Sequence, residues 1–162
     1  MRLKIKKTGS FKSSKKYLDL IANSKVYDVA TNTPISFAAN ISTKLGNDVF
    51  LKREDMQPIF SFKIRGAYNK IANLTPQQKK RGVLTASAGN HAQGVALAAK
   101  NHGVSALIIM PTDAPKMKID NTRALGAEIV LYDRIKESRE EIGEKISKDR
   151  GLTLIKPYDE PQ

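Results

Sequence analysis

Short apolar runs alternate with longer amphipathic stretches through most of this chain. From Gly46 onward each run follows a glycine, and the runs are NDVFLK, VLTAS, VSALIIM, AEIVLY and LTLIKP. Each run is rich in Val, Ile, Leu or Phe and is short enough for a β-strand. The segment SALIIM is apolar at almost every position, which is typical of a strand covered on both faces, as in a parallel sheet.

The stretches between these runs carry signals for the beginnings of helices. Thr75 precedes a proline and is followed three residues later by Gln78, so a capping box predicts a helix start. Ser138 and Glu141 form a second box, and Asp113 before an Ala-Pro pair predicts another start. A helix is therefore expected between each pair of strands.

Four glycines mark the expected ends of these helices, and they are Gly82, Gly103, Gly126 and Gly151. Glycine at this place commonly adopts the left-handed turn that terminates a helix. The four are separated by 21, 23 and 25 residues, enough each time for one strand and one crossover helix. The pattern predicts an α/β fold, an open parallel sheet with helices on both faces.

The region before Gly46 has a different pattern. Residues 13–30 are predicted to form a helix, and its apolar contacts would be Tyr17, Leu18, Leu20 and Ile21. Pro34 is expected to interrupt the chain, and residues 37–45, FAANISTKL, are expected to form a second helical stretch.

The composition excludes several classes of chemistry. The 162 residues include no Cys, which excludes disulfide scaffolds, Cys-ligated metal sites and thiol catalysis. With only His91 and His102 present, no metal site is expected. No apolar run approaches the ~20 residues of a membrane span, and no signal-peptide core follows the basic start. We therefore expect a cytoplasmic protein without a membrane partner.

The formal net charge of +12 is the one unusual feature of the composition. Residues 1–16 hold seven basic and no acidic residues, so the other 146 residues carry only +5. A basic chain invites a nucleic-acid or anionic-surface function. Because the aromatic content is 6% and no RNA-binding signature is present, a polyanion-binding protein is the least favoured function and no nucleic-acid partner is expected. Residues 1–16 are interpreted as a basic tail.

Residues 84–94, LTASAGNHAQG, are the first candidate for a binding site. A strand is expected to end near Ser87 and a helix to open near Asn90, so that small residues expose backbone N–H groups to a carboxylate or phosphate. Gly89 and Gly94 fit G-x-x-x-x-G, but no Lys-Ser/Thr follows, so a P-loop is rejected. The alternative is an ordinary turn with Ser and Asn caps, in which His91 is a surface or capping residue.

The second candidate is Lys63, which stands between Phe62 and Ile64 at the start of an expected helix. An apolar setting would lower the pKa of the lysine toward that of a nucleophile and would suit Schiff-base chemistry. The alternative is a solvated lysine at a helix start. The apolar face of this helix would comprise Ile64, Ala67, Tyr68 and Ile71.

Taken together, the two segments resemble a known family. LKREDMQPIFSFKIRGAYNKI closely resembles the cofactor-lysine segment of pyridoxal-phosphate-dependent threonine dehydratases, in the tryptophan-synthase-β-like superfamily. TASAGNHAQGVA resembles the substrate-carboxylate loop of the same family. The resemblance continues in order through VYDVATNTPI, IIMPTDAPKMK, TRALGAEIVLYD and PYDEP, and covers about residues 17–162.

The resemblance implies a fold type II pyridoxal-phosphate enzyme and a role for each motif residue. Lys63 would bind pyridoxal 5'-phosphate covalently and later move the α-proton. Phe62 would pack against the pyridine ring, and Asn90 would hydrogen-bond the ring hydroxyl. The loop that holds the substrate carboxylate would comprise Ser87, Ala88, Gly89, Asn90 and His91.

The implied reaction is the β-elimination of L-threonine to 2-oxobutanoate and ammonia, as in isoleucine biosynthesis, or of L-serine to pyruvate. Serine racemases and hydroxyaspartate ammonia-lyases share the lysine segment and are alternatives within the enzyme class. A non-catalytic remnant of the fold is a further alternative.

The family pattern also implies a glycine-rich loop for the cofactor phosphate. The ten glycines of this sequence include no two closer than five residues, so that loop is missing. We therefore expect residues 17–53 to begin a large cofactor domain and residues 54–153 to form a complete small domain. Residues 154–162 would begin a truncated return into the large domain. The partners expected are an amino-acid substrate, further copies of the full-length chain, or a complementary chain that supplies the phosphate loop.

Overall fold

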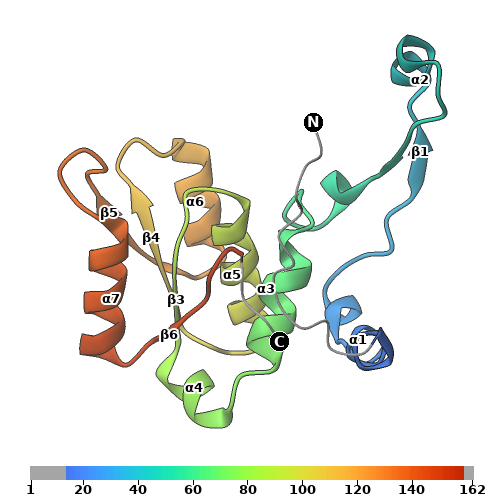
Figure 1. Ribbon diagram of the computed structural model, residues 1–162. Coiled ribbons are helices and arrows are strands. Elements are labelled where there is room, and N and C mark those ends of the chain that lie inside the picture. Colours follow the sequence, from blue (N-terminus) through green and yellow to red (C-terminus); the bar gives the residue numbers. More distant parts are fainter. Residues whose placement is uncertain (1–13, 159–162) are drawn as a thin grey trace, which may run out of the picture.

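The computed structural model describes residues 14–158, which form a sheet-and-helix body and a projecting arm (Figure 1). The helices are α1 (Ser14–Ala22), α2 (Ala39–Leu45), α3 (Lys63–Ala72), α4 (Pro76–Arg81), α5 (Asn90–Asn101), α6 (Lys116–Ala124) and α7 (Arg139–Arg150). The strands are β1 (Ile35–Phe37), β2 (Phe50–Lys52), β3 (Val83–Ala86), β4 (Ala106–Pro111), β5 (Glu128–Tyr132) and β6 (Thr153–Leu154). Two short 3-10 turns are η1 (Val26–Asp28) and η2 (Glu54–Met56).

The body is built on a four-stranded parallel sheet with the order β5-β4-β3-β6. Side chains of β4 alternate between two hydrophobic clusters: Ile108 and Met110 pack on the side of α3 and α5, and Leu107 and Ile109 on the side of α7. Because both faces are covered, β4 is buried along its whole length. The predicted open parallel sheet with helices on both faces is confirmed.

The local signals at helix ends are largely confirmed. Thr75 and Gln78 form the complete capping box that begins α4, and the Ser138 hydroxyl accepts the Glu141 N–H at the start of α7. The four glycines at the expected helix ends all have positive φ. A helix also begins after the Asp113-Ala114-Pro115 segment, but α6 starts at Lys116 with Pro115 as its N-cap, and the Asp113 carboxylate instead pairs with Arg134 at 2.8 Å.

The N-terminal region differs from the prediction in two ways. The helix predicted over residues 13–30 spans only Ser14–Ala22 as α1, and its four expected contact residues are all exposed. The NDVFLK run does form β2, but this strand pairs with β1 in a separate antiparallel ribbon that projects from the body as the arm (Figure 1). Helices α3 and α4 do follow β2, but they do not form a crossover between parallel strands, because β2 is not part of the parallel sheet.

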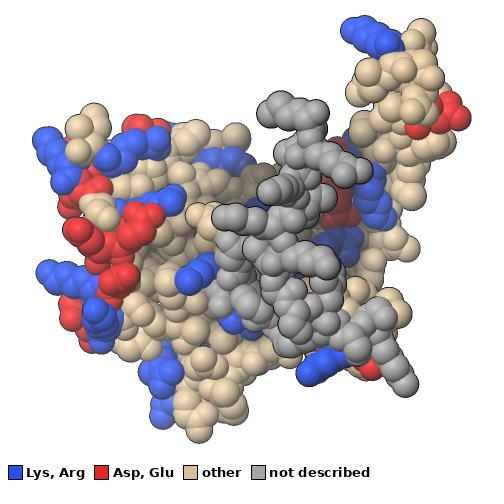
Figure 2. Space-filling view, in the orientation of Figure 1, with Lys and Arg blue, Asp and Glu red and all other residues tan. Residues whose placement is uncertain are grey.

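The body surface around α7 carries both signs of charge (Figure 2). Arg150 pairs with Glu128 at 3.0 Å, and Arg139 pairs with Glu140 at 2.7 Å. Such exposed pairs contribute little to stability, but they leave no large field of one sign on this face. Most of the predicted basic tail lies outside the described residues. Within residues 14–158, no helix is long and apolar enough to cross a membrane.

Candidate functional site

Lys63 is the first residue of α3, and the packing of this helix decides where the lysine lies. The four residues of the predicted apolar face are all buried, and most of them pack in the cluster that also contains α5. Lys63 itself is half-buried, and its ammonium donates to the Pro157 carbonyl at 2.7 Å. The expected apolar setting is found only in part: the Lys63 Nζ lies 5.6 Å from the centroid of the Phe62 ring, but Phe62 is 59% exposed and the ammonium has a polar partner.

Gly94 allows α5 to approach α3 closely beside this lysine. A Cβ atom at position 94 would lie 3.2 Å from the Lys63 carbonyl oxygen and 3.4 Å from the Ala67 Cβ. In the sequence, Gly94 stands out only as the second glycine of a G-x-x-x-x-G pattern that is not a P-loop. Its function is packing, since any side chain there would push the start of α3 away from α5.

A cavity of about 290 Å³ adjoins Lys63. It lies between α3, the start of α5 and the segment after β6, and its lining includes Phe62, Lys63, Lys70, His91 and residues 155–158. The expectation that His91 is a surface or capping residue is wrong, because its ring is buried and its Nε2 lies 3.3 Å from the Ile155 carbonyl oxygen. Lys63 and His91, from the two sequence motifs, therefore meet at one cavity.

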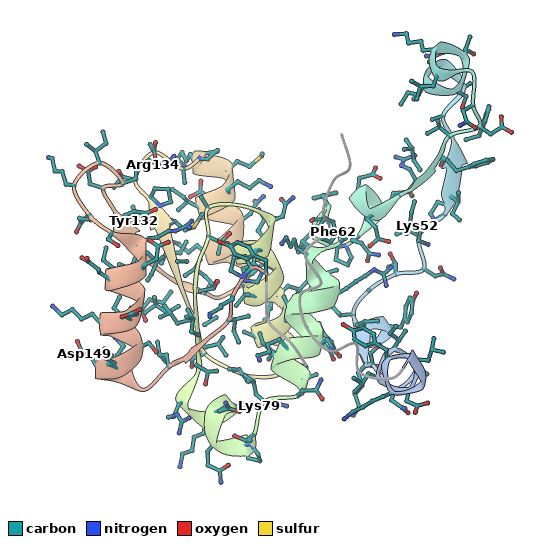
Figure 3. All side chains as sticks on the ribbon, in the orientation of Figure 1. Lys52, Phe62, Lys79, Tyr132, Arg134 and Asp149 are labelled. Atoms are coloured by element: carbon teal, nitrogen blue, oxygen red, sulfur yellow. The ribbon has the colours of Figure 1, made fainter. Side chains whose placement is uncertain are left out.

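The rest of the predicted loop lies farther along the carboxyl edge of the sheet. Ser87 and Ala88 line a second hollow of about 460 Å³, which also includes Tyr132 and Arg134. Figure 3 shows Phe62 beside α3, whereas Tyr132 and Arg134 lie toward the far side of the sheet. The two hollows are therefore distinct.

The start of α5 lacks the side-chain cap that the alternative interpretation required. Gly89 is the N-cap residue, no side chain accepts from the first turn, and the Ser87 hydroxyl accepts only the Gly89 N–H at 3.3 Å. The backbone N–H groups at the positive end of this helix are thus not covered by a cap. Asn90 is exposed, and its Oδ1 accepts from the Lys118 ammonium at 2.9 Å, so α6 fixes the orientation of this amide.

A third hollow of about 360 Å³ lies between β3, β6 and α7. Its lining includes Thr85, whose fully buried hydroxyl has no hydrogen-bond partner among the described residues. Residues 155–158 line both this hollow and the Lys63 cavity. Thr85 lies within the segment TASAGNHAQGVA, but the motif assigned it no role, because its environment depends on where the chain runs after β6.

An amine, a buried imidazole and an uncapped helix start lie together at the carboxyl edge of this open parallel sheet. The chain thus has the form of the α/β proteins that bind their ligands at this edge. Residues 26–162 match the family described as pyridoxal-phosphate dependent enzyme. The chain belongs to this family, so the resemblance found in the sequence is confirmed, and members of the family depend on pyridoxal phosphate.

Several relatives are more specific. The chain is 48% identical over 145 residues to a Pasteurella multocida protein named L-threonine dehydratase biosynthetic IlvA, and 47% identical to the mitochondrial threonine dehydratase of Saccharomyces cerevisiae. These alignments cover 90% of this chain and 28% and 25% of the relatives. The chain thus spans about a quarter of the length of these relatives.

Solved structures agree with the sequence relatives. The processed form of threonine deaminase isoform 2 from Solanum lycopersicum matches 94% of this chain and 42% of its own, with a TM-score of 0.84 at 45% identity. Maize serine racemase matches 90% of this chain and 44% of its own, with a TM-score of 0.81 at 36% identity. The predicted fold type is confirmed by these likenesses.

The residues present fit the aldehyde end of the pyridoxal phosphate molecule but not its phosphate end. Lys63 places a primary amine at the edge of a cavity, as covalent binding of an aldehyde requires. A phosphate cradle of adjacent glycines cannot be built from this sequence, whose glycines are all at least five residues apart. The chain can therefore supply the lysine for the cofactor, but it does not contain the glycine-rich loop that would hold the phosphate.

Proposed function

We propose that this chain supplies the lysine-bearing part of an enzyme that deaminates L-threonine by β-elimination. The α-proton and the β-hydroxyl leave the substrate, and hydrolysis of the resulting enamine gives 2-oxobutanoate and ammonia. L-serine would give pyruvate by the same route. The observation that carries the proposal is the meeting of Lys63 and His91 at one cavity, beside an uncapped helix start, in a chain 48% identical to a threonine dehydratase.

Each residue of the two motifs has a proposed part in this reaction. The Lys63 amine holds the cofactor and, once released, takes the α-proton. The loop of residues 87–91 binds the substrate carboxylate through backbone N–H groups at the start of α5. Phe62 packs against the cofactor ring, and Asn90 donates to the ring hydroxyl, because Lys118 already occupies its amide oxygen. The bound cofactor supplies the electron sink that makes the α-proton acidic.

The domain arrangement is part of the same proposal. Residues 54–153 form the small domain, whereas residues 17–53 and 154–162 belong to a larger cofactor domain. The arm supports this division, since it exposes many apolar side chains, including Ile35, Phe37, Ile41, Leu45 and Phe50. A two-stranded ribbon is marginally stable by itself, so further polypeptide is needed to cover it.

The glycine-rich loop for the cofactor phosphate would then come from outside the 162 residues, either from the same longer chain or from a complementary chain. A small amino acid is the substrate, the assembly is a homo-oligomer, and the compartment is the cytoplasm. Racemisation of serine is a second candidate reaction, favoured by the likeness to maize serine racemase.

Covalent trapping tests the role of Lys63. The purified chain is incubated with pyridoxal phosphate, reduced with borohydride and mapped by mass spectrometry. Lys63 should be labelled preferentially, and Lys63→Met should remove this label. Lys70→Met is the matched control, because Lys70 lies on the same helix and lines the same cavity. Labelling without preference for Lys63 would contradict its proposed role.

Substrate assays separate the remaining alternatives. Release of 2-oxobutanoate from L-threonine supports the dehydratase reaction, and formation of D-serine from L-serine supports the racemase. Preferential labelling of Lys63 without turnover would identify a chain that needs the polypeptide carrying the phosphate loop. Stable stoichiometric labelling with turnover by the 162-residue chain would contradict the need for that polypeptide.

A further inference from the structure

The Glu54 carboxylate is the centre of a hydrogen-bond network near Lys63. It accepts from the Arg65 guanidinium at 2.8 and 3.0 Å through both oxygens, and from the Thr33 hydroxyl at 2.7 Å. Gln57 donates to the same carboxylate at 3.2 Å. The Arg65 and Glu54 side chains are only 24% and 18% exposed. A two-pronged guanidinium-carboxylate pair in such a place is geometrically specific as well as strong.

Gln57 extends this network to the preceding segment. Its side chain is 1% exposed, its Oε1 accepts the Thr31 N–H, and its Nε2 donates to the Thr31 carbonyl oxygen, both at 2.9 Å. The amide therefore pairs with one backbone residue as a strand neighbour would. Residues 31–33, the η2 turn and α3 are joined through these contacts. We call this network the Glu54 clamp. It comprises the side chains of Thr33, Glu54, Gln57 and Arg65 and the backbone groups of Thr31.

The chain between the clamp and Lys63 is held in an unfavourable conformation. Phe60 has φ +56° and is the one non-glycine residue with positive φ within residues 14–158. A side chain disfavours this region, and Phe60 is largely exposed, so no burial compensates. The Phe60 N–H donates to the Gln57 carbonyl at 2.7 Å. The turn is thus anchored by Gln57 on one side and by α3 on the other.

We infer that the Glu54 clamp positions Lys63. It fastens Arg65, two residues after the lysine in the first turn of α3, to the same group that anchors Gln57 before the turn. Both ends of the Phe60 turn are thereby fixed, and the start of α3 is held with the lysine directed at its cavity. This inference rests on the proposed function of Lys63. Glu54, Gln57 and Arg65 are positioning residues and do not touch the reacting atoms.

The electrostatics support a clamp that stays intact near neutral pH. Hydrogen bonds from Arg65 hold the pKa of Glu54 at about 2, well below its usual value. The same pairing raises the pKa of Arg65. Both groups are therefore charged throughout the range in which a lysine amine would react.

The test measures how fast Lys63 reacts with pyridoxal phosphate, trapped with borohydride and quantified against Lys70 in the same chain. Glu54→Gln and Arg65→Gln should lower the rate at Lys63 relative to Lys70 by about tenfold, since a misplacement of ~1 Å can cost up to a hundredfold. Arg65→Lys keeps the positive charge but cannot make both hydrogen bonds to the carboxylate, so the labelling rate at Lys63 should fall by an intermediate factor. Asp55→Asn is the matched control, because Asp55 lies on the same turn but is exposed and pairs with Arg53 instead of Arg65.

The outcomes separate this inference from the proposed function. An unchanged ratio of Lys63 to Lys70 labelling in folded Glu54→Gln or Arg65→Gln would overturn the clamp, as would an equal fall at both lysines. A wild-type chain without preference for Lys63 would contradict the proposed function, while the ratio in the variants would still test positioning. Should Glu54→Gln fail to fold, Arg65→Lys carries the test, because it preserves the ion pair.

Discussion

Substitution of Gly94 by Ala tests whether close contact between α3 and α5 sets the position of Lys63. The new Cβ would lie 3.2 Å from the Lys63 carbonyl oxygen and 3.4 Å from both the Ala67 Cβ and the Ile59 Cδ1. The Ile59 methyl can move, but the other two atoms belong to α3, so the helix must shift as a unit. Overpacking of this kind costs about 1–3 kcal/mol. Alanine regains about 1 kcal/mol of helix propensity. We therefore expect a net loss of about 1 kcal/mol.

Gly66→Ala is the matched control for this prediction. Gly66 also lies within a helix, α3, but a Cβ there would meet no atom within 4 Å. Only the propensity gain applies, so this variant should be more stable by about 1 kcal/mol. The two Gly-to-Ala substitutions should thus change the free energy of unfolding in opposite directions, with a difference of about 2 kcal/mol between the variants.

Urea unfolding followed by circular dichroism measures this difference. With a slope of about 2 kcal/mol per molar urea, the midpoints of the two variants should be separated by about 1 M. Gly94→Ala should also lower labelling of Lys63, because the Lys63 backbone must move. If Gly94→Ala were as stabilising as Gly66→Ala, the argument that this glycine is required for helix contact would be refuted.

Three further predictions concern single side chains. Thr75→Ala removes the hydroxyl of the α4 capping box and should lower the free energy of unfolding by about 1 kcal/mol in urea titrations. Thr85→Val replaces a buried hydroxyl that has no hydrogen-bond partner among the described residues. This variant should raise the free energy of unfolding by about 1 kcal/mol, which a higher thermal midpoint would show. The pKa of Glu54 is about 2 in the folded chain, below its usual value of 4.5. Its charged form therefore stabilises the fold at pH values above 4.5, and this contribution is lost as the pH falls toward 2. Urea midpoints of Glu54→Gln should consequently fall less between pH 7 and pH 3 than those of wild type, and an equal fall would contradict that assignment.

The parallel sheet could be predicted from sequence because its signals are local. The run at β4 is apolar on both faces, and the glycines at the helix ends require only their own backbone conformation. The capping box at Thr75 likewise depends on residues three apart. Each of these features is determined within one element and its immediate flanks, so pattern reasoning succeeds.

The features that sequence reasoning missed depend on distant residues. His91 is buried because the chain returns at Ile155, 64 residues later. Asp113 precedes α6 by three residues but does not cap it, because its carboxylate pairs with Arg134, which follows the end of β5. The pairing of β2 with β1 could not be inferred from the regular rhythm, since nothing in NDVFLK distinguishes an antiparallel ribbon strand from a parallel one.

In the candidate site too, some features could be predicted from local motifs and others depend on tertiary packing. The motifs pointed to Lys63 and to the loop of residues 87–91, but the partition of these residues over two hollows follows from the packing of α5 against α3. The Glu54 network joins Glu54 and Gln57 to residues more than twenty positions earlier in the chain. Glu54, Gln57 and Arg65 lie within the segment that resembles the cofactor-lysine segment, but nothing local in the sequence indicates their contacts with Thr31 and Thr33.

The strand order has a consequence for the time at which the fold can be completed. β3 pairs on one side with β4, which follows soon in the chain, and on the other with β6, about 70 residues later. At 5–20 residues per second, synthesis leaves that edge of β3 without its partner for roughly 4–14 s. An open edge is a template for pairing with another chain, so nascent chains that stop before residue 153 should be the aggregation-prone ones. The cavity beside Lys63 needs residues 155–158 as its wall and would be among the last parts of the body to form.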